Sequence, residues 1–164
     1  MNTMMAKDSR KSGAGKNKTF RYSTFILSDK IFGFEILSVK EVLPLPKITP
    51  VPNVSPYVLG VFNLRGSIMS LVDLHYFLGL VPKPADPSDM VLVLESNNVR
   101  VGVTVERVLD IMTIAEEDIQ STTREIPIHI AQFTAGLYEK EGLGTVHLLD
   151  SGALLNSPEM QKYR

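Results

Sequence analysis

The chain has 164 residues, no cysteine and a formal net charge of −1 at pH 7. This length predicts one substantial core or two small joined ones, and the lack of cysteine excludes disulfides and thiolate metal sites and favours a reducing compartment. Its 44% hydrophobic and 21% charged residues are ordinary for a globular protein, and no apolar stretch approaches the roughly 18 to 20 residues that a membrane helix needs.

Residues 1–18 form a polar leader rich in Lys, Ser, Gly and Asn, which we expect to be disordered. No apolar segment follows its basic residues, so we do not expect a secretory signal. Its five basic residues and one Asp leave about +4 on the leader and about −5 on residues 19–164. An acidic body argues against nucleic-acid binding, whereas the basic leader suits contact with an acidic partner.

Short strands separated by turn residues fill the next segment. We expect strands over 19–27 and 31–36, which flank the turn 28–30 and form a hairpin, and a third strand over 38–43. Pro44 and Pro46 end that strand. The proline-rich segment 47–57 predicts an irregular connector.

The segment 57–80 combines two strands, a tight turn and a helix. The apolar runs 57–64 and 68–72 predict strands, and Arg65-Gly66-Ser67 between them predicts a turn. Asp73 is suited to cap a helix whose apolar face carries Leu74, Phe77 and Leu78. Arg65 would then lie at the tip of an apolar hairpin.

The second half repeats this succession after a crossing segment over 81–88 that contains three prolines. We expect a hairpin from strands 90–95 and 99–105 and a further strand over 108–114. Residues 116–120 are ambiguous, and 122–130 are expected to be a loop or an irregular strand.

Two pairs of segments align in the same chain order. The run GFEILSVKEVL from Gly33 matches GVTVERVLDIM from Gly102, which aligns Ile36 with Val105 and Glu41 with Asp110. The hairpin unit 57–80 matches 135–155, which aligns Gly60 with Gly136, Gly66 with Gly142 and Asp73 with Asp150. The chain therefore resembles two tandem copies of one small unit.

This repeat predicts an all-β protein of two small five-stranded β-barrel subdomains packed together, with short helices. A single continuous sandwich is the alternative. We expect one subdomain over about 19–82 and the other over about 83–156, with an exchange of strands at the ends, followed by a C-terminal tail over 157–164.

No catalytic or metal-binding arrangement is evident in the sequence. His75, His129 and His147 are far apart and lack metal-ligand spacing. The run GAGKN at 13–17 lacks the glycine spacing and the Ser or Thr of a phosphate loop, and Ser67 and Ser70 lack a nucleophile-elbow setting. We therefore expect no enzyme activity, no metal and no cofactor. A cryptic enzyme would require a polar pocket with strongly perturbed acids.

The same segments, with the NLRG run at 63–66, resemble CheW, the coupling protein of bacterial chemosensory arrays, over about residues 19–156. The resemblance implies a cytoplasmic adaptor that links the regulatory domain of a CheA-type histidine kinase to the cytoplasmic tips of chemoreceptors, without membrane insertion. An adaptor of another chemosensory pathway, such as pilus motility, fits equally well, whereas a small-barrel nucleic-acid binder fits less well.

The resemblance also implies candidate binding residues. For the receptor, an apolar groove between the barrels would accept a helical hairpin, and a pair formed by Glu41 and Arg65 would lie beside it; the candidates are Ile36, Glu41, Arg65, Met90, Val101 and Val108. For the kinase, the candidates are Val39, Leu45 and Gly60. Core packing is the alternative for the aliphatic side chains, and a close backbone approach is the alternative for Gly60. The chain departs from the family at Ser70, commonly proline, and at His75, commonly arginine.

Overall fold

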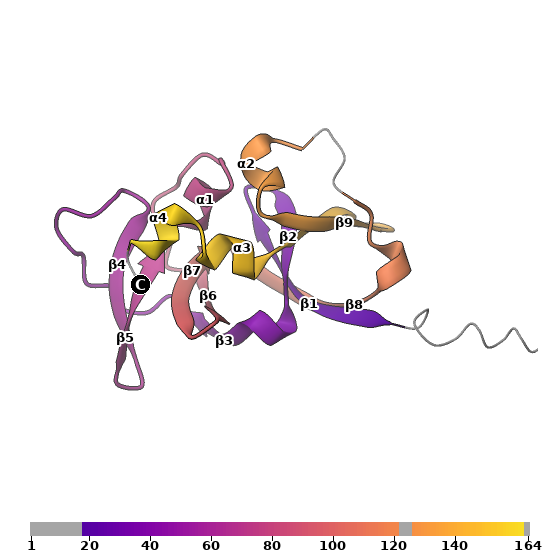
Figure 1. Ribbon diagram of the computed structural model, residues 1–164. Helices are drawn as coiled ribbons and strands as arrows, with labels where there is room; N and C mark the ends of the chain where they lie inside the picture. The colour runs from indigo at the N-terminus through magenta and orange to yellow at the C-terminus, as the bar shows by residue number, and fades with distance from the viewer. Residues whose placement is uncertain (1–17, 122–125, 163–164) are drawn as a thin grey trace, which may run out of the picture.

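The computed structural model describes residues 18–121 and 126–162 and consists of two five-stranded sheets that lie side by side (Figure 1). In spatial order, the first sheet contains β8 (Arg107–Ala115), β1 (Thr19–Leu27), β2 (Lys30–Glu35), β10 (Gly144–Leu149) and β9 (Thr134–Lys140). The second contains β3 (Val39–Pro44), β6 (Met90–Ser96), β7 (Val99–Val105), β5 (Ser67–Val72) and β4 (Val58–Leu64).

The helices are short and lie between or beyond these strands. They are α1 (Leu74–Phe77), α2 (Ile128–Ala131), α3 (Ser151–Leu155) and α4 (Pro158–Gln161), with the 3-10 turns η2 (Ile36–Ser38) and η3 (Glu116–Asp118). The predicted strands are confirmed with small differences in their ends, and the segments 47–57 and 81–88 contain no strand, as expected. The basic leader lies outside the described residues, apart from Lys18.

The predicted helix cap at Asp73 is confirmed, and the aligned Asp150 caps a helix in the other copy. Asp73 accepts a hydrogen bond from the backbone N–H of His75 at 3.0 Å, and Asp150 accepts one from the N–H of Ala153 at 3.0 Å. Each carboxylate satisfies an amide that the first turn of its helix leaves without an intrahelical partner. Strand β5 and its counterpart β10 are therefore each followed by a capped helix.

The internal repeat is confirmed by the order of the strands. Replacing each strand of the first sheet by its counterpart in the other copy converts the order β8-β1-β2-β10-β9 into β3-β6-β7-β5-β4, which is the order of the second sheet. The parallel pairs β2–β10 and β5–β7 also correspond. The two copies are thus related by an approximate two-fold symmetry.

The sheets do not coincide with residues 19–82 and 83–156, because the two halves of the chain exchange strands. Each sheet takes its first hairpin from one copy and its last three strands from the other. The chain crosses between the sheets after β2 and after β7: η2 separates β2 from β3, and Glu106 alone separates β7 from β8. At both links the chain passes directly from one sheet into the other.

Neither sheet is a fully closed barrel, but one bridge links the two edges of each. Thr49 and Val61 exchange backbone hydrogen bonds of 2.8 Å across the second sheet. Gln120 and Leu137 exchange bonds of 2.8 and 2.9 Å at the corresponding place in the first sheet. The edge strands are therefore partly protected from pairing with other chains.

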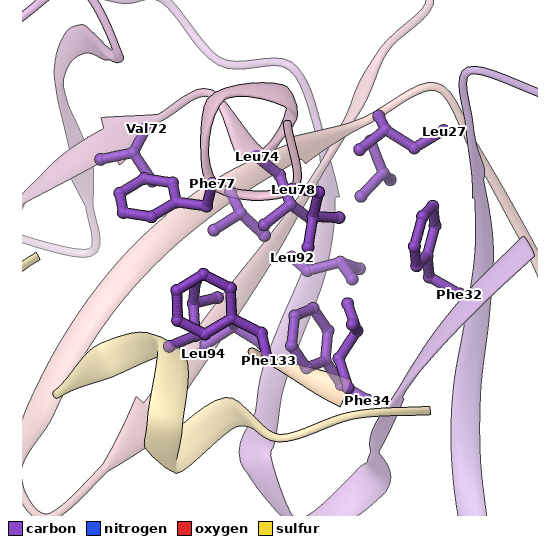
Figure 2. Close-up of a cluster of buried hydrophobic side chains, with 14 of the residues drawn as sticks. Leu27, Phe32, Phe34, Val72, Leu74, Phe77, Leu78, Leu92, Leu94 and Phe133 are labelled. Atoms are coloured by element: carbon purple, nitrogen blue, oxygen red, sulfur yellow. The ribbon is translucent and has the colours of Figure 1, made fainter. Parts of the chain in front are cut away.

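Three apolar clusters follow from this arrangement. The largest lies between the sheets and includes Phe34 of β2, Leu92 of β6 and Phe77 of α1 (Figure 2). Each sheet also curls around a smaller cluster of its own, one containing Phe62 and the other Leu148. Strand β6 is buried on both faces, because Leu92 and Leu94 join the central cluster while Val91 and Val93 join that of the second sheet.

The C-terminal segment after residue 156 packs against the body, contrary to the expected tail. Ser157 caps α4 through a bond from the N–H of Met160 at 3.4 Å, and Met160 is 2% exposed within the central cluster. The hydroxyl of Tyr57 donates to the carbonyl of Glu159 at 2.9 Å. Figure 1 shows α4 lying beside the second sheet although α3 begins near the first.

We expect Met160→Ala to lower the free energy of unfolding by about 2–5 kcal/mol, because it leaves a cavity in the central cluster. Urea denaturation of the full chain measures this change, with exposed Lys162→Ala as the control. Equal stability of the two variants would show that α4 contributes little to the core.

The segment 126–131 also differs from the expected loop or strand. It contains the short helix α2, whose Ile130 is fully buried in the central cluster, while residues 122–125 lie outside the described part. Across residues 18–121 and 126–162, no helix has the length and apolar character needed to cross a bilayer.

Candidate functional site

The two strands of the β4–β5 hairpin are joined by a two-residue turn, Arg65-Gly66, whose first residue is an arginine. Arg65 has φ 50° and Gly66 has φ 89°, as a turn with two left-handed residues requires. The side chain of Asn63 accepts the N–H of Gly66 at 3.0 Å. The β6–β7 turn carries Asn97 and Asn98, which tolerate this conformation, whereas arginine gains nothing from it. The backbone alone therefore gives no reason for an arginine here.

The side chain of Arg65 forms a bidentate ion pair with Glu41 of β3. Its Nη1 and Nη2 lie 2.5 and 2.7 Å from the two carboxylate oxygens. The Arg65 side chain is 73% exposed and that of Glu41 is 26% exposed. This arrangement confirms the pairing that the resemblance implied, and it leaves the remaining guanidinium donors facing solvent.

The pair stays ionised over the physiological range. The hydrogen bond from Arg65 lowers the pKa of the Glu41 carboxyl below its ordinary value, with the positive charge of Arg65 adding to the effect. The hydrogen bond to Glu41 raises the pKa of Arg65 further. Because both groups are exposed, we expect the pair to orient the guanidinium rather than to stabilise the fold.

The pair lies across the seam between the edge strands β3 and β4 of the second sheet. On β3, exposed Lys40 and Val42 alternate with half-buried Glu41 and Leu43. Exposed Ile68 follows the Arg65 turn on β5 at 65% exposure. Glu41 therefore shares its face of β3 with half-buried Leu43, whereas exposed Val42 lies on the opposite face.

Gly60, a candidate for the kinase surface, has a structural role at the same seam. Its φ is +148°, and a Cβ atom there would lie 2.5 Å from the carbonyl oxygen of Thr49, the residue that bridges to Val61. At the corresponding position, a Cβ on Gly136 would lie 2.4 Å from Cγ2 of Ile119. These glycines let the backbone approach closely where each sheet nearly closes.

The other candidates are aliphatic side chains near the junction of the sheets. Val39, Met90 and Val108 are half-buried and pack against the central cluster, and Ile36 is half-buried in η2. Leu45 is half-buried against the cluster of the second sheet. These side chains combine a core contact with an exposed surface, as anchors of an interface do.

Val101 does not share this exposure. It is 4% exposed within the central cluster, which is the alternative that the sequence left open for the aliphatic candidates. Sequence reasoning also missed Leu37, which is 77% exposed in η2 beside Ile36. A short turn that interrupts the alternation of a strand could have indicated an outward leucine here.

The described residues contain no cluster of three or more His, Cys, Asp or Glu side chains able to hold a metal. The histidines lie on separate elements: His75 is buried on α1, His129 is exposed on α2 and His147 is half-buried on β10. The noteworthy geometry of this molecule is therefore at its surface, in the Arg65–Glu41 pair and its aliphatic neighbours.

A family model described as the CheW-like domain matches residues 21–159. The chain belongs to the CheW-like family. It is 28% identical to the chemotaxis protein CheW of Treponema pallidum over 91% of this chain and 89% of that protein. It is 36% identical to a probable chemotaxis protein CheW of Rhizobium etli, over 69% of this chain and 73% of that protein.

A solved structure has the same fold. The crystal structure of the scaffolding protein TtCheW from Thermoanaerobacter tengcongensis matches with a TM-score of 0.74 and 22% identity, over 87% of this chain and 96% of that one. Proteins of the CheW family are non-catalytic scaffolds or adaptors of chemotaxis, and this chain has the family's sequence and fold over most of its length.

Proposed function

We propose that this protein couples a CheA-type histidine kinase to the cytoplasmic tips of chemoreceptors. The observation that carries the proposal is the exposed, bidentate Arg65–Glu41 pair on a chain of the CheW-like family. Glu41 holds the guanidinium in one orientation, so that its remaining donors meet a partner without first losing side-chain freedom. Such an adaptor would work in the cytoplasm, at receptor arrays on the inner face of the membrane.

The receptor surface in this proposal centres on Glu41 and Arg65, with half-buried aliphatic side chains as anchors. A helical receptor tip presents apolar residues at helical spacing and polar ones beside them, which suits an aliphatic surface bordered by a fixed charge. The aliphatic anchors are Ile36, Met90 and Val108, to which exposed Leu37 is added. Val101 is left out because its side chain is buried.

The kinase surface centres on Val39 and Leu45 of the second sheet and its β3 edge. Val42 is exposed on the same edge strand, but its side chain lies on the opposite face from that of Val39. Gly60 contributes the shape of the backbone beneath this edge rather than a contact. An apolar centre with a charged rim is the usual composition of a specific protein interface.

Reconstitution tests the proposal. The full chain is mixed with a CheA-type kinase and with vesicles that carry a chemoreceptor cytoplasmic fragment, and the sedimented kinase and its autophosphorylation rate are measured. We expect the kinase to sediment and to become receptor-regulated only when this protein is present. If the protein bound only the receptor or only the kinase, and never both, the result would contradict a coupling role.

The pathway is tested in the same assay. Receptors and kinase of a pilus-motility system replace those of the swimming pathway, and preferential recruitment identifies the pathway served. A nucleic-acid role is disfavoured by the charge of about −5 on residues 19–164, and salt-dependent binding to single-stranded DNA would revive it.

A further inference from the structure

His75 is a buried histidine with a carboxylate at each ring nitrogen. Its side chain is 6% exposed; Nδ1 lies 2.7 Å from the Asp73 carboxylate and Nε2 lies 3.1 Å from that of Glu106. The same oxygen of Asp73 accepts the backbone N–H of His75 as the cap of α1. The ring is therefore held between its own helix cap and a residue of a different element.

Glu106 also contacts the β1–β2 hairpin and the crossing segment. It accepts the N–H of Ser28 in the β1–β2 turn at 3.1 Å, and Lys83 of the crossing segment lies 3.0 Å from it. The N–H of Glu106 donates to the carbonyl of Ile26 at 3.1 Å. Because α1 follows the second sheet and the β1–β2 turn belongs to the first, this cluster joins the two sheets.

The protonation state of the ring decides how many of these contacts are satisfied. Neutral imidazole has one donor and one acceptor nitrogen, whereas ionised carboxylates only accept. Both contacts are therefore hydrogen bonds only when His75 is an imidazolium. An arginine at this position would keep its charge at every physiological pH, but a histidine loses its charge close to neutrality.

The charges that face the ring favour the imidazolium. Asp73 and Glu106 contact it directly, and Lys83 opposes it from beyond Glu106. Asp86 of the crossing segment and Asp89, which follows that segment, line the same cleft of about 470 Å³, and Asp29 interacts with Lys83. The hydrogen bond to Asp73 raises the pKa of His75 above its ordinary value, although burial of the ring opposes this effect.

We propose that His75 is a pH-sensitive clamp between the two sheets, closed by the imidazolium and opened at the Glu106 contact when the ring loses its proton. The shorter bond to Asp73 keeps the remaining proton on Nδ1, so the lone pair of Nε2 then faces the Glu106 carboxylate. Glu106 keeps its contacts with Ser28 and Lys83 and moves with these residues away from His75. This inference does not depend on the proposed coupling function.

The sign of the pH dependence follows from the direction of the shift. A histidine whose pKa is raised by folding stabilises the folded state fully below the unfolded value near 6.5. That contribution is lost as the pH rises through the folded pKa. His147 behaves oppositely, because burial lowers its pKa, and its contribution is lost as the pH falls below 6.5.

NMR of the full chain tests the clamp. The imidazole signals are titrated from pH 5 to 9, with His129→Gln and His147→Gln used for assignment. We expect the His75 midpoint above 6.5 and the amide of Ser28 to shift with the same midpoint. Glu106→Gln should lower the His75 midpoint. A His75 midpoint at or below 6.5, or a Ser28 amide that does not follow it, would overturn the proposal.

Denaturation separates the clamp from a merely structural histidine. The ratio of the unfolding constants of the wild type and His75→Arg is measured at pH 6 and pH 8.5, where the other titrating groups affect both chains alike. We expect this ratio to rise about tenfold with pH, as the loss of a charged hydrogen bond implies. Equal pH dependence of the two chains would contradict the clamp. His75→Gln, if folded, should lack the dependence.

Discussion

Replacing Arg65 by alanine is expected to weaken the joint assembly with kinase and receptor by about tenfold or more while leaving the unfolding midpoint nearly unchanged. The expected loss corresponds to one charge-assisted hydrogen bond to a partner. Folding should hardly change because the side chain is 73% exposed and alanine meets the same backbone strain at φ 50°. Sedimentation of the kinase with receptor vesicles measures the assembly, and circular dichroism measures the unfolding midpoint.

A charge exchange distinguishes contact with a partner from a role within the fold. The double variant Glu41→Arg/Arg65→Glu can rebuild the ion pair with reversed polarity across the same seam. If the outward donors of Arg65 contact a partner, the double variant should remain as weak as Arg65→Ala. Full recovery of assembly would show that the pair acts only inside this protein.

Two further substitutions control this experiment. Arg65→Lys keeps the charge but loses the bidentate geometry, so we expect an intermediate affinity. Arg21→Ala removes an exposed arginine from β1, in the other sheet, and should have little effect. If Arg21→Ala weakened the assembly as much as Arg65→Ala, the effect would come from the net charge of the protein rather than from a specific contact of Arg65.

Gly60→Ala is expected to lower the free energy of unfolding by about 3 kcal/mol or more. The new Cβ would meet the carbonyl oxygen of Thr49 at 2.5 Å, and backbone cannot move aside as a flexible side chain can. The φ of +148° adds strain for any residue with a side chain. Urea denaturation measures the change, which lies at or above the upper end of the usual effect of a point substitution.

Two other glycines separate the components of this effect. Gly66 has φ +89° and open space around it, so Gly66→Ala should cost only the backbone strain of about 1–2 kcal/mol. Gly136→Ala meets chiefly the Ile119 side chain, which can shift, so we expect an intermediate loss. Equal losses for Gly60→Ala and Gly66→Ala would show that the seam is looser than its geometry indicates.

Substitution of Gly60 can also affect kinase binding indirectly, through the stability of the fold. A loss of kinase binding in a destabilised Gly60 variant would reflect the shape of the β3 edge rather than a lost contact. Val39→Ala and Leu45→Ala test contacts more directly, because both side chains are half-buried.

Local sequence patterns were sufficient for the strands, the turns and the helix caps. Alternation of apolar residues, Asn97-Asn98 and Arg65-Gly66 at hairpin turns, and Asp73 before an apolar helix all act through neighbours in the chain. The internal repeat was also readable, because both copies meet the same local requirements. The pairing of Arg65 with Glu41 came from the resemblance, since 24 residues separate them.

The partition of the strands between the sheets depends on contacts between distant residues. Nothing local distinguishes a β3 strand that stays with β2 from one that crosses to β6, because the difference lies in which apolar face finds a partner. The same reason explains Val101 and α4: burial is a property of the assembled core, to which Met160 contributes from the far end of the chain. Periodicity along a chain shows which side chains share a face, but folding determines what that face meets.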